Sequence, residues 1–163
     1  MMQSVTAVVI AHDEPDYFAA TLAALKNQSR LPEQVVIVDT SNDDRCEQLA
    51  RDAGFEQILK LSPKSNLAKI TAAAREVAGE SRWLWLLHDD SAPDHEALEK
   101  LLAAVEDRPN IAMVGPKILG WHDRSHLLEV GISIARNGAR WTGLEEKEYD
   151  QGQHDGTFEV LSV

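Results

Sequence analysis

The chain alternates between short apolar runs and longer stretches in which apolar residues recur every three or four positions. The first pattern predicts buried strands, and the second predicts amphipathic helices. Because strands and helices of these lengths alternate, we expect a doubly wound α/β fold, with a parallel sheet covered by helices on both faces. The predicted strands cover residues 5–11, 34–39, 55–61, 83–87 and 111–114, and the predicted helices cover 16–26, 43–53, 66–78 and a segment from Pro93 to the break at Pro109.

The run from Trp83 to Leu87 is the most informative of these segments. Five consecutive large apolar residues suit a strand that is buried on both faces, which predicts a central position in a parallel sheet. This run ends on His88, Asp89 and Asp90. Open α/β sheets bind ligands just beyond the carboxyl ends of their strands, so the two carboxylates are expected to hold a cation or a polar ligand.

The pattern changes after residue 114. Strand-like runs at 127–135 and 139–142 flank an Arg-Asn-Gly segment, which predicts an antiparallel hairpin. Residues 143–156 are polar, acidic and interrupted by glycine, as is typical of a surface loop. A last strand is predicted over residues 158–163.

Composition and net charge limit the classes of function that the chain can have. The 163 residues include 44% hydrophobic and 26% charged residues, which suits one domain with its own core. A net charge of −11 argues against nucleic-acid binding, which needs clustered Lys and Arg. An anionic ligand would therefore need a metal ion or local dipoles. The single cysteine indicates a reducing compartment, and neither a secretory leader nor a membrane span of about 20 apolar residues is predicted.

Acidic or polar residues follow three of the predicted parallel strands. His12 and Asp13 come after the first strand, Asp39 ends the second, and Asp89 and Asp90 follow the fourth. The carboxyl ends of parallel strands share one edge, so these side chains are expected to converge on one crevice. The alternative is that Asp39 and Asp90 cap the helices that follow them. Each residue alone favours the cap, whereas the three strand ends together favour a site.

Two ordered segments resemble a known family. VTAVVIAHDEPDYFAATLAALKNQSRLPEQVVIVDTSNDD, from residue 5, resembles the start of a family 2 glycosyltransferase of the GT-A fold, and WLWLLHDDSAP, from residue 83, resembles the acidic metal motif of that family. The resemblance covers residues 5–116. It implies a single GT-A domain over 1–163 that continues past the C-terminus, with a nucleotide-binding half at 1–116 and the start of an acceptor-side region at 117–163.

The resemblance also implies how the donor nucleotide is held. Ala11, His12 and Asp13 fall in the first-strand loop, which holds the nucleotide sugar, and His12 occupies the position of an aromatic ring that packs on the base. Ala11 stands where a small polar residue is usual. Asp39 matches the carboxylate that accepts a hydrogen bond from the imide N–H of uracil or thymine.

The resemblance implies a metal as well. Asp89 matches the carboxylate near the ribose and the metal, and Asp90 matches the carboxylate that binds Mn²⁺ or Mg²⁺ on the diphosphate. His88 stands where many relatives have a third Asp, so fewer carboxylates are available. Lys64 or Lys69 could add positive charge, although a solvated lysine is the simpler interpretation of each.

The implied function is metal-assisted, inverting transfer of a sugar from a UDP- or dTDP-sugar to a glycan or lipid-linked acceptor. Such an enzyme would serve cell-wall or polysaccharide biosynthesis in the cytoplasm or at the inner face of the cell membrane, and it could associate with the membrane through a segment beyond this chain. The catalytic base is expected beyond Val163, so the chain alone is expected to be inactive in transfer. One alternative is a non-catalytic domain that binds sugar nucleotides. Another is a phospho-acceptor receiver domain built on Asp13 and Lys117, which the extra strand and helix before Asp89 disfavours.

Overall fold

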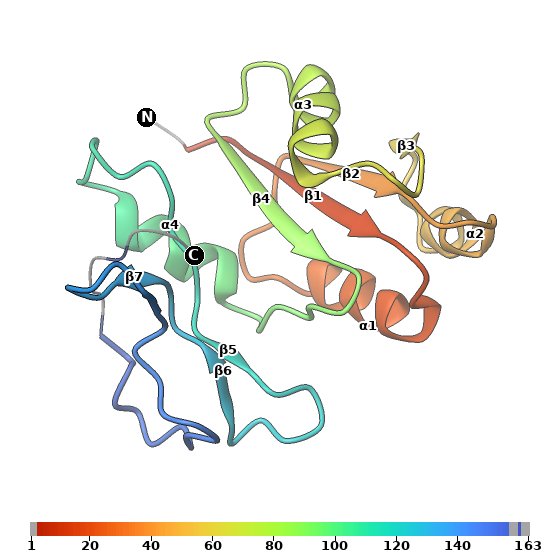
Figure 1. The fold of residues 1–163 in the computed structure, drawn as a ribbon. Helices are drawn as coiled ribbons and strands as arrows, with labels where there is room; N and C mark the ends of the chain where they lie inside the picture. The colour runs from red at the N-terminus through yellow and green to blue at the C-terminus, as the bar shows by residue number, and fades with distance from the viewer. Residues whose placement is uncertain (1–2, 157–159, 161–163) are drawn as a thin grey trace. The chain divides into compact units, whose positions relative to one another are not determined.

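The computed structural model describes residues 3–156 and residue 160. Along this part of the chain, strands and helices alternate as far as α4, and short strands follow (Figure 1). The chain forms two compact units that divide between Glu99 and Lys100, inside α4. The elements are β1 (Val5–Ala11), α1 (Pro15–Lys26), β2 (Gln34–Asp39), α2 (Arg45–Asp52), β3 (Ile58–Lys60), α3 (Leu67–Ala78), β4 (Trp83–His88), α4 (Ala97–Val105), β5 (Ile118–Leu119), β6 (Leu127–Glu129), β7 (Ser133–Ile134) and β8 (Arg140–Trp141).

The first unit is built on a four-stranded parallel sheet in the order β3-β2-β1-β4. All seven residues of β1 are buried, and successive residues face opposite layers. Ala7 and Val9 pack with α1 and α2, whereas Val8 and Ile10 pack with α3. The sheet therefore has helices on both faces, which confirms the predicted α/β class.

The helices of this unit begin and end at residues that the sequence marks. Pro15 occupies the first turn of α1, where its missing N–H costs nothing. The side chain of Asn66 caps α3 by accepting a hydrogen bond from the N–H of Lys69 at 2.9 Å. Gly79, with φ of +58°, ends α3 in a conformation that other residues rarely adopt.

Two predictions about the parallel strands are wrong. β4 is an edge strand of the sheet, because β1 takes the central position between β2 and β4. Only Leu87 of β4 is buried, and Leu86 is exposed. Residues 111–114 form no strand, and Met113 among them is exposed. A short apolar run satisfies the hydrophobic pattern of a strand without supplying a neighbour with which to pair.

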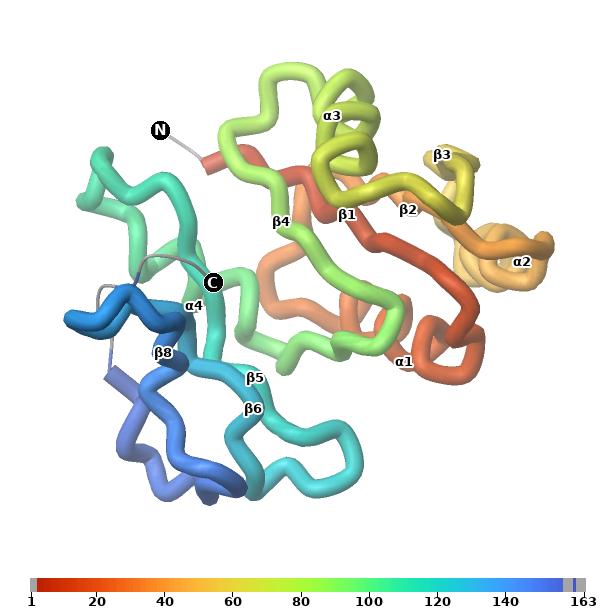
Figure 2. The backbone as a smooth tube through the Cα atoms, in the orientation of Figure 1, coloured from red at the N-terminus to blue at the C-terminus, as the bar shows by residue number. Residues whose placement is uncertain are grey.

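The second unit contains short antiparallel pairs. β5 pairs with β6, and β7 pairs with β8 across residues 135–139, which confirms the predicted hairpin (Figure 2). The N–H of Ala135 donates to the carbonyl of Ala139 at 2.9 Å, so the loop itself has three residues, 136–138. Gly138, the last of them, has φ of +81°, as this kind of loop requires. The first arm is shorter than predicted because Gly131, with φ of +104°, separates β6 from β7.

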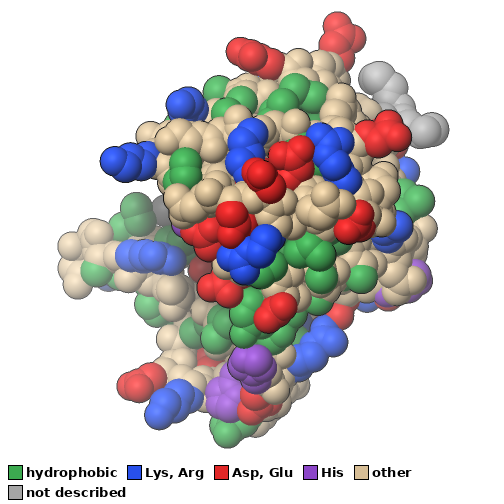
Figure 3. Space-filling model, turned by 90° about the vertical axis from the view of Figure 1, so that its right-hand side faces the viewer, with side chains coloured by type: hydrophobic (Ala, Val, Ile, Leu, Met, Phe, Trp, Pro, Cys, Tyr) green, Lys and Arg blue, Asp and Glu red, His purple; other side chains and the backbone are tan. Residues whose placement is uncertain are grey.

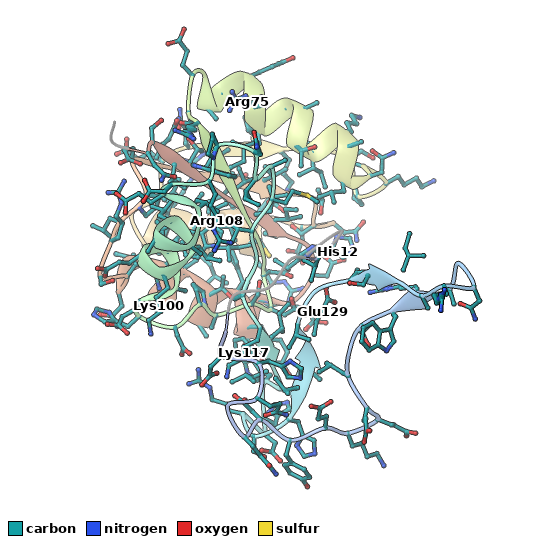
Figure 4. The ribbon with its side chains drawn as sticks, turned by 90° about the vertical axis from the view of Figure 1, so that its left-hand side faces the viewer. His12, Arg75, Lys100, Arg108, Lys117 and Glu129 are labelled. Atoms are coloured by element: carbon teal, nitrogen blue, oxygen red, sulfur yellow. The ribbon has the colours of Figure 1, made fainter. Side chains whose placement is uncertain are left out.

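The acidic segment at 143–156 contains no strand or helix among the named elements, as predicted for a loop. Lys117, which is labelled in Figure 4, directly precedes β5. It binds this loop through the carboxylates of Asp150, at 2.6 Å, and Asp155. The strand predicted for 158–163 lies outside the described residues apart from Val160. None of the helices in the described range has both the length and the apolar character needed to cross a bilayer.

Candidate functional site

The predicted site residues of the first unit gather at the carboxyl edge of its sheet. Asp39 pairs with Ala11 in the register of β2 and β1, and the N–H of Asp89 donates to the carbonyl of Ile10 at 3.0 Å on the other side of β1. Asp39 and Asp89 thus flank one residue of the central strand, with Cα atoms roughly 10 Å apart, which is two strand spacings. Acidic side chains gather on the face toward which the strands run, with Lys and Arg among them (Figure 3).

Asp89 links β4 to the loop after β1. Its side chain is buried, and Oδ2 accepts a hydrogen bond from the backbone N–H of His12 at 2.6 Å. The hydroxyl of Thr21, on α1, donates to the backbone carbonyl of Asp89 at 2.9 Å. A buried carboxylate with a charge-assisted bond is held firmly, so Asp89 fixes the path of the first-strand loop.

His12 presents its ring at this edge, at the end of β1 (Figure 4). The hydroxyl of Thr40 donates its one proton to the carbonyl of Ala11 at 2.9 Å. His12 Nδ1, 3.1 Å from the same hydroxyl oxygen, must therefore be the donor to it. This hydrogen bond leaves Nε2 on the exposed side, 3.8 Å from Asp13 Oδ2, in a side chain that is 55% exposed. The ring is oriented, and one side of it is open to a ligand.

Asp13 is tied to the loop after β2. Its two carboxylate oxygens accept hydrogen bonds from the backbone N–H of Asn42, at 3.2 Å, and from the Asn42 side chain, at 3.0 Å. Asp13 and Asn42 therefore connect the two loops that leave β1 and β2.

Asp39 is completely buried and is satisfied by its neighbours. Oδ1 accepts hydrogen bonds from the N–H and the hydroxyl of Ser41, at 2.8 and 2.6 Å, and Oδ2 accepts one from Lys60 Nζ at 2.8 Å. The hydrogen bond from Lys60 to Asp39 raises the pKa of Lys60, so this lysine stays charged. Asp39 does not cap α2, whose N-cap is Asp44, and α4 begins seven residues after Asp90. The capping interpretation is therefore wrong for both.

The residues predicted to hold a metal have the right chemistry but are few. Asp90 is exposed. Within residues 3–156 and 160, no group of three or more His, Cys, Asp or Glu side chains could hold a metal. Two adjacent carboxylates nevertheless fit Mg²⁺ or Mn²⁺, which often bind proteins through one or two carboxylates and take their other ligands from phosphate and water.

Cys46, on α2, lies beneath the same edge. It is buried, and its Sγ donates to the carbonyl of His12 at 3.6 Å. Burial raises the pKa of the thiol to about 11, and the negative charges of Asp39 and Asp89 add to the effect. The sulfur is protonated near neutral pH and helps hold the first-strand loop from below.

Sequence reasoning missed Lys60 and Ser41. Lys64 and Lys69, the lysines it considered, are exposed. The signal for Lys60 is its place at the end of β3, directly across from Asp39 in the register. The strand was predicted to end at residue 61 instead of at Lys60, so the pairing of Lys60 with Asp39 was not recognised.

The chain is similar to known proteins in sequence and in fold. The sequence matches the family model described as "Glycosyl transferase family 2" over residues 6–154. It is 33% identical to the galactofuranosyltransferase GlfT1 of Mycobacterium tuberculosis over 135 residues, covering 78% of this chain and 43% of that protein. Identity to GlfT1 of Mycolicibacterium smegmatis is 26% over 127 residues, covering 76% and 42% of the two chains. The chain thus spans about two fifths of the length of these relatives.

Solved structures of similar fold include two of S. aureus TarS. One, described as TarS 1-349, has a TM-score of 0.51 at 16% identity and covers 78% of this chain and 42% of the other. The second has a TM-score of 0.50 at 18% identity and covers 71% and 24%. At these identities the likeness concerns the fold.

Proposed function

Since the chain belongs to glycosyl transferase family 2, we propose that the carboxyl edge of its sheet binds the nucleotide diphosphate of a sugar donor. The observation that carries this proposal is the convergence of His12, Asp39 and Asp89 on the end of one central strand. Open α/β sheets hold nucleotides at this edge. We further propose that the whole protein transfers the sugar to a glycan or lipid-linked acceptor with inversion.

Each residue has a defined part in the proposed site. Asp39, oriented by Ser41, accepts the imide N–H of uracil or thymine. The ring of His12, held by Thr40, packs on the base, and Asp89 keeps that ring in place through the backbone of the same residue. Because these groups are positioned before the donor binds, less ordering is needed on binding.

Asp89 and Asp90 would hold Mg²⁺ or Mn²⁺ against the diphosphate. The bound ion would offset the negative charge that grows on the leaving diphosphate during transfer. The chain itself carries −11, so a diphosphate is repelled unless a cation screens it. The names of the GlfT1 relatives suggest a galactofuranosyl group as the sugar. We propose that the product belongs to cell-wall or polysaccharide biosynthesis.

Calorimetric titration with UDP and dTDP, in Mn²⁺ and in EDTA, tests the site. We expect the better nucleotide to bind at least about tenfold more tightly in Mn²⁺, a difference of about 1.4 kcal/mol. Asp90→Asn should remove most of that metal dependence, because it removes the exposed carboxylate. Asp107→Asn, at another exposed aspartate outside the site, is the matched control and should leave it unchanged.

Three other results would change the proposal. Equal affinity in EDTA and Mn²⁺ would remove the metal from it. A failure of both nucleotides to bind in either buffer would remove the donor site. Tight, base-selective binding by a natural full-length protein that never transfers sugar would instead identify a non-catalytic binding domain.

A further inference from the structure

Lys60 lies where a bound base would have to meet Asp39. Asp39 has no exposed surface, and Lys60, which contacts its Oδ2, has a side chain that is 40% exposed. A buried carboxylate needs such a partner, because an uncompensated charge in the interior is costly. A base that donates to Asp39 Oδ2 would therefore share this oxygen with Lys60.

The three contacts of Lys60 are not equal. Its Nζ donates to Asp39 Oδ2 at 2.8 Å, to the backbone carbonyl of Asp43 at 2.7 Å, and to Asp44 Oδ1 at 3.3 Å. An ammonium has three protons, so these partners use all of them. The bond to Asp44 is the longest, and the side chain of Asp44 is 92% exposed, so water already competes for both groups. It is the contact that a ligand can replace most easily.

The base edge has a matching pattern of groups. Uracil and thymine present an imide N–H with a carbonyl oxygen on each side. Asp39 supplies an acceptor and Lys60 supplies a donor directly beside it. A carboxylate oxygen has two lone pairs, so Oδ2 can accept the imide N–H while it keeps Lys60.

We propose that Lys60 determines base specificity by donating to a carbonyl oxygen beside the imide, in exchange for its bond to Asp44. This inference rests on the proposed function, because it needs a nucleotide base at Asp39. The exchange keeps the ammonium fully hydrogen-bonded and leaves Asp39 compensated throughout. It requires the ammonium to move away from Asp44 and the edge to open enough for the base to reach Asp39, whose side chain has no exposed surface.

A comparison of three ligands on the parent chain and on one variant tests the contact. Affinities of UDP, 2-thio-UDP and 4-thio-UDP are measured for the parent chain and for Lys60→Met, because sulfur is a weaker acceptor than oxygen. The diphosphate is the same in all three ligands, so loss of the lysine charge cancels in the ratios. We expect one thio analogue to bind about tenfold more weakly than UDP to the parent chain, and about equally with UDP to Lys60→Met. Lys64→Met, at a neighbouring exposed lysine, should keep the parent ratio.

Asp44→Asn covers the case in which Lys60→Met does not fold. Asp44 is exposed, so its replacement should leave the fold intact. Removing this competitor should tighten UDP binding more than it tightens binding of the affected thio analogue. Equal gains for all three ligands would show a general charge effect and would overturn the inference.

The outcomes separate this inference from the proposed function. If UDP does not bind the parent chain, or if Asp39→Asn binds it equally well, the base site itself is wrong. If UDP binding depends on Asp39 but neither thio analogue binds differently from UDP, or the difference survives in Lys60→Met, only the role of Lys60 is wrong.

Discussion

Each unit of the chain contains a lysine that bridges two aspartates, and the two arrangements differ in burial. In the Lys60 clamp (Lys60, Asp39 and Asp44), the side chain of Asp39 has no exposed surface and that of Asp44 is 92% exposed; we call the two aspartates the arms of the clamp. The Lys117 clamp (Lys117, Asp150 and Asp155) has arms that are 16% and 64% exposed. Both lysines have raised pKa values because of the first aspartate they contact, Asp39 and Asp150 respectively.

The difference lies in what supports each clamp. Asp39 and Lys60 end adjacent strands of a parallel sheet whose central strand is fully buried. Lys117 instead joins a two-residue strand to an acidic loop. The Lys60 clamp therefore joins two strand ends at the edge of a buried core, whereas the Lys117 clamp holds a surface loop against a short strand. Burial, more than the number of ion pairs, sets the cost of breaking each one.

The largest expected effect comes from removing the lysines. Lys60→Met leaves Asp39 buried without its cation and should lower the free energy of unfolding by about 2–3 kcal/mol, less than for a fully buried pair because Lys60 is partly exposed. Lys117→Met should cost less than half as much. Urea denaturation followed by tryptophan fluorescence measures both. An equal or larger loss for Lys117→Met would contradict the comparison.

Acid should affect the Lys117 clamp in a defined direction. The hydrogen bond from Lys117 lowers the pKa of Asp150 below 3.8. The folded state thus holds this proton less tightly than the unfolded state, so the stabilisation is complete above about pH 4 and is lost as the pH falls through the lowered pKa. Asp150→Asn should flatten this part of the stability profile below pH 4. Denaturation midpoints at several pH values test it, and a parallel profile for the variant would contradict it.

The smallest effect is expected from the exposed arms. Asp44→Asn and Asp155→Asn each remove one solvated ion-pair partner and should change stability by no more than about 0.5 kcal/mol. Thermal melts of both variants beside the parent chain measure this. A loss for Asp44→Asn close to that for Lys60→Met would mean that the exposed arm, and not Asp39, anchors Lys60.

How far sequence predicts structure also differs between the regions. The strands at 5–11 and 34–39 were predictable because long β-branched runs and burial on both faces indicate the same element. The order of the strands was not, because hydrophobicity alone gave β4 the central place that β1 occupies. The short apolar run at 111–114 forms no strand, because no neighbouring strand among the described residues pairs with it. The hairpin at 135–139 was predictable from its local Asn-Gly signal.

The candidate site shows the same limit. Asp39 and Asp89 could be placed at one edge from their positions after strands, since parallel strands share that edge. Lys60 could not be assigned to Asp39, because their contact depends on a register that joins residues 21 positions apart. Whether the edge binds a nucleotide and a metal stays a prediction.

The position of Cys46 has a practical consequence. With a pKa of about 11, only about one thiol in ten thousand is ionised at pH 7, and the sulfur is also shielded from solvent. Alkylation of Cys46 would therefore require the contact between α2 and the loop after β1 to open transiently, and the labelling rate would report how often that happens. Mass spectrometry of alkylated Cys46 would therefore measure local opening beneath the strand ends without any substitution.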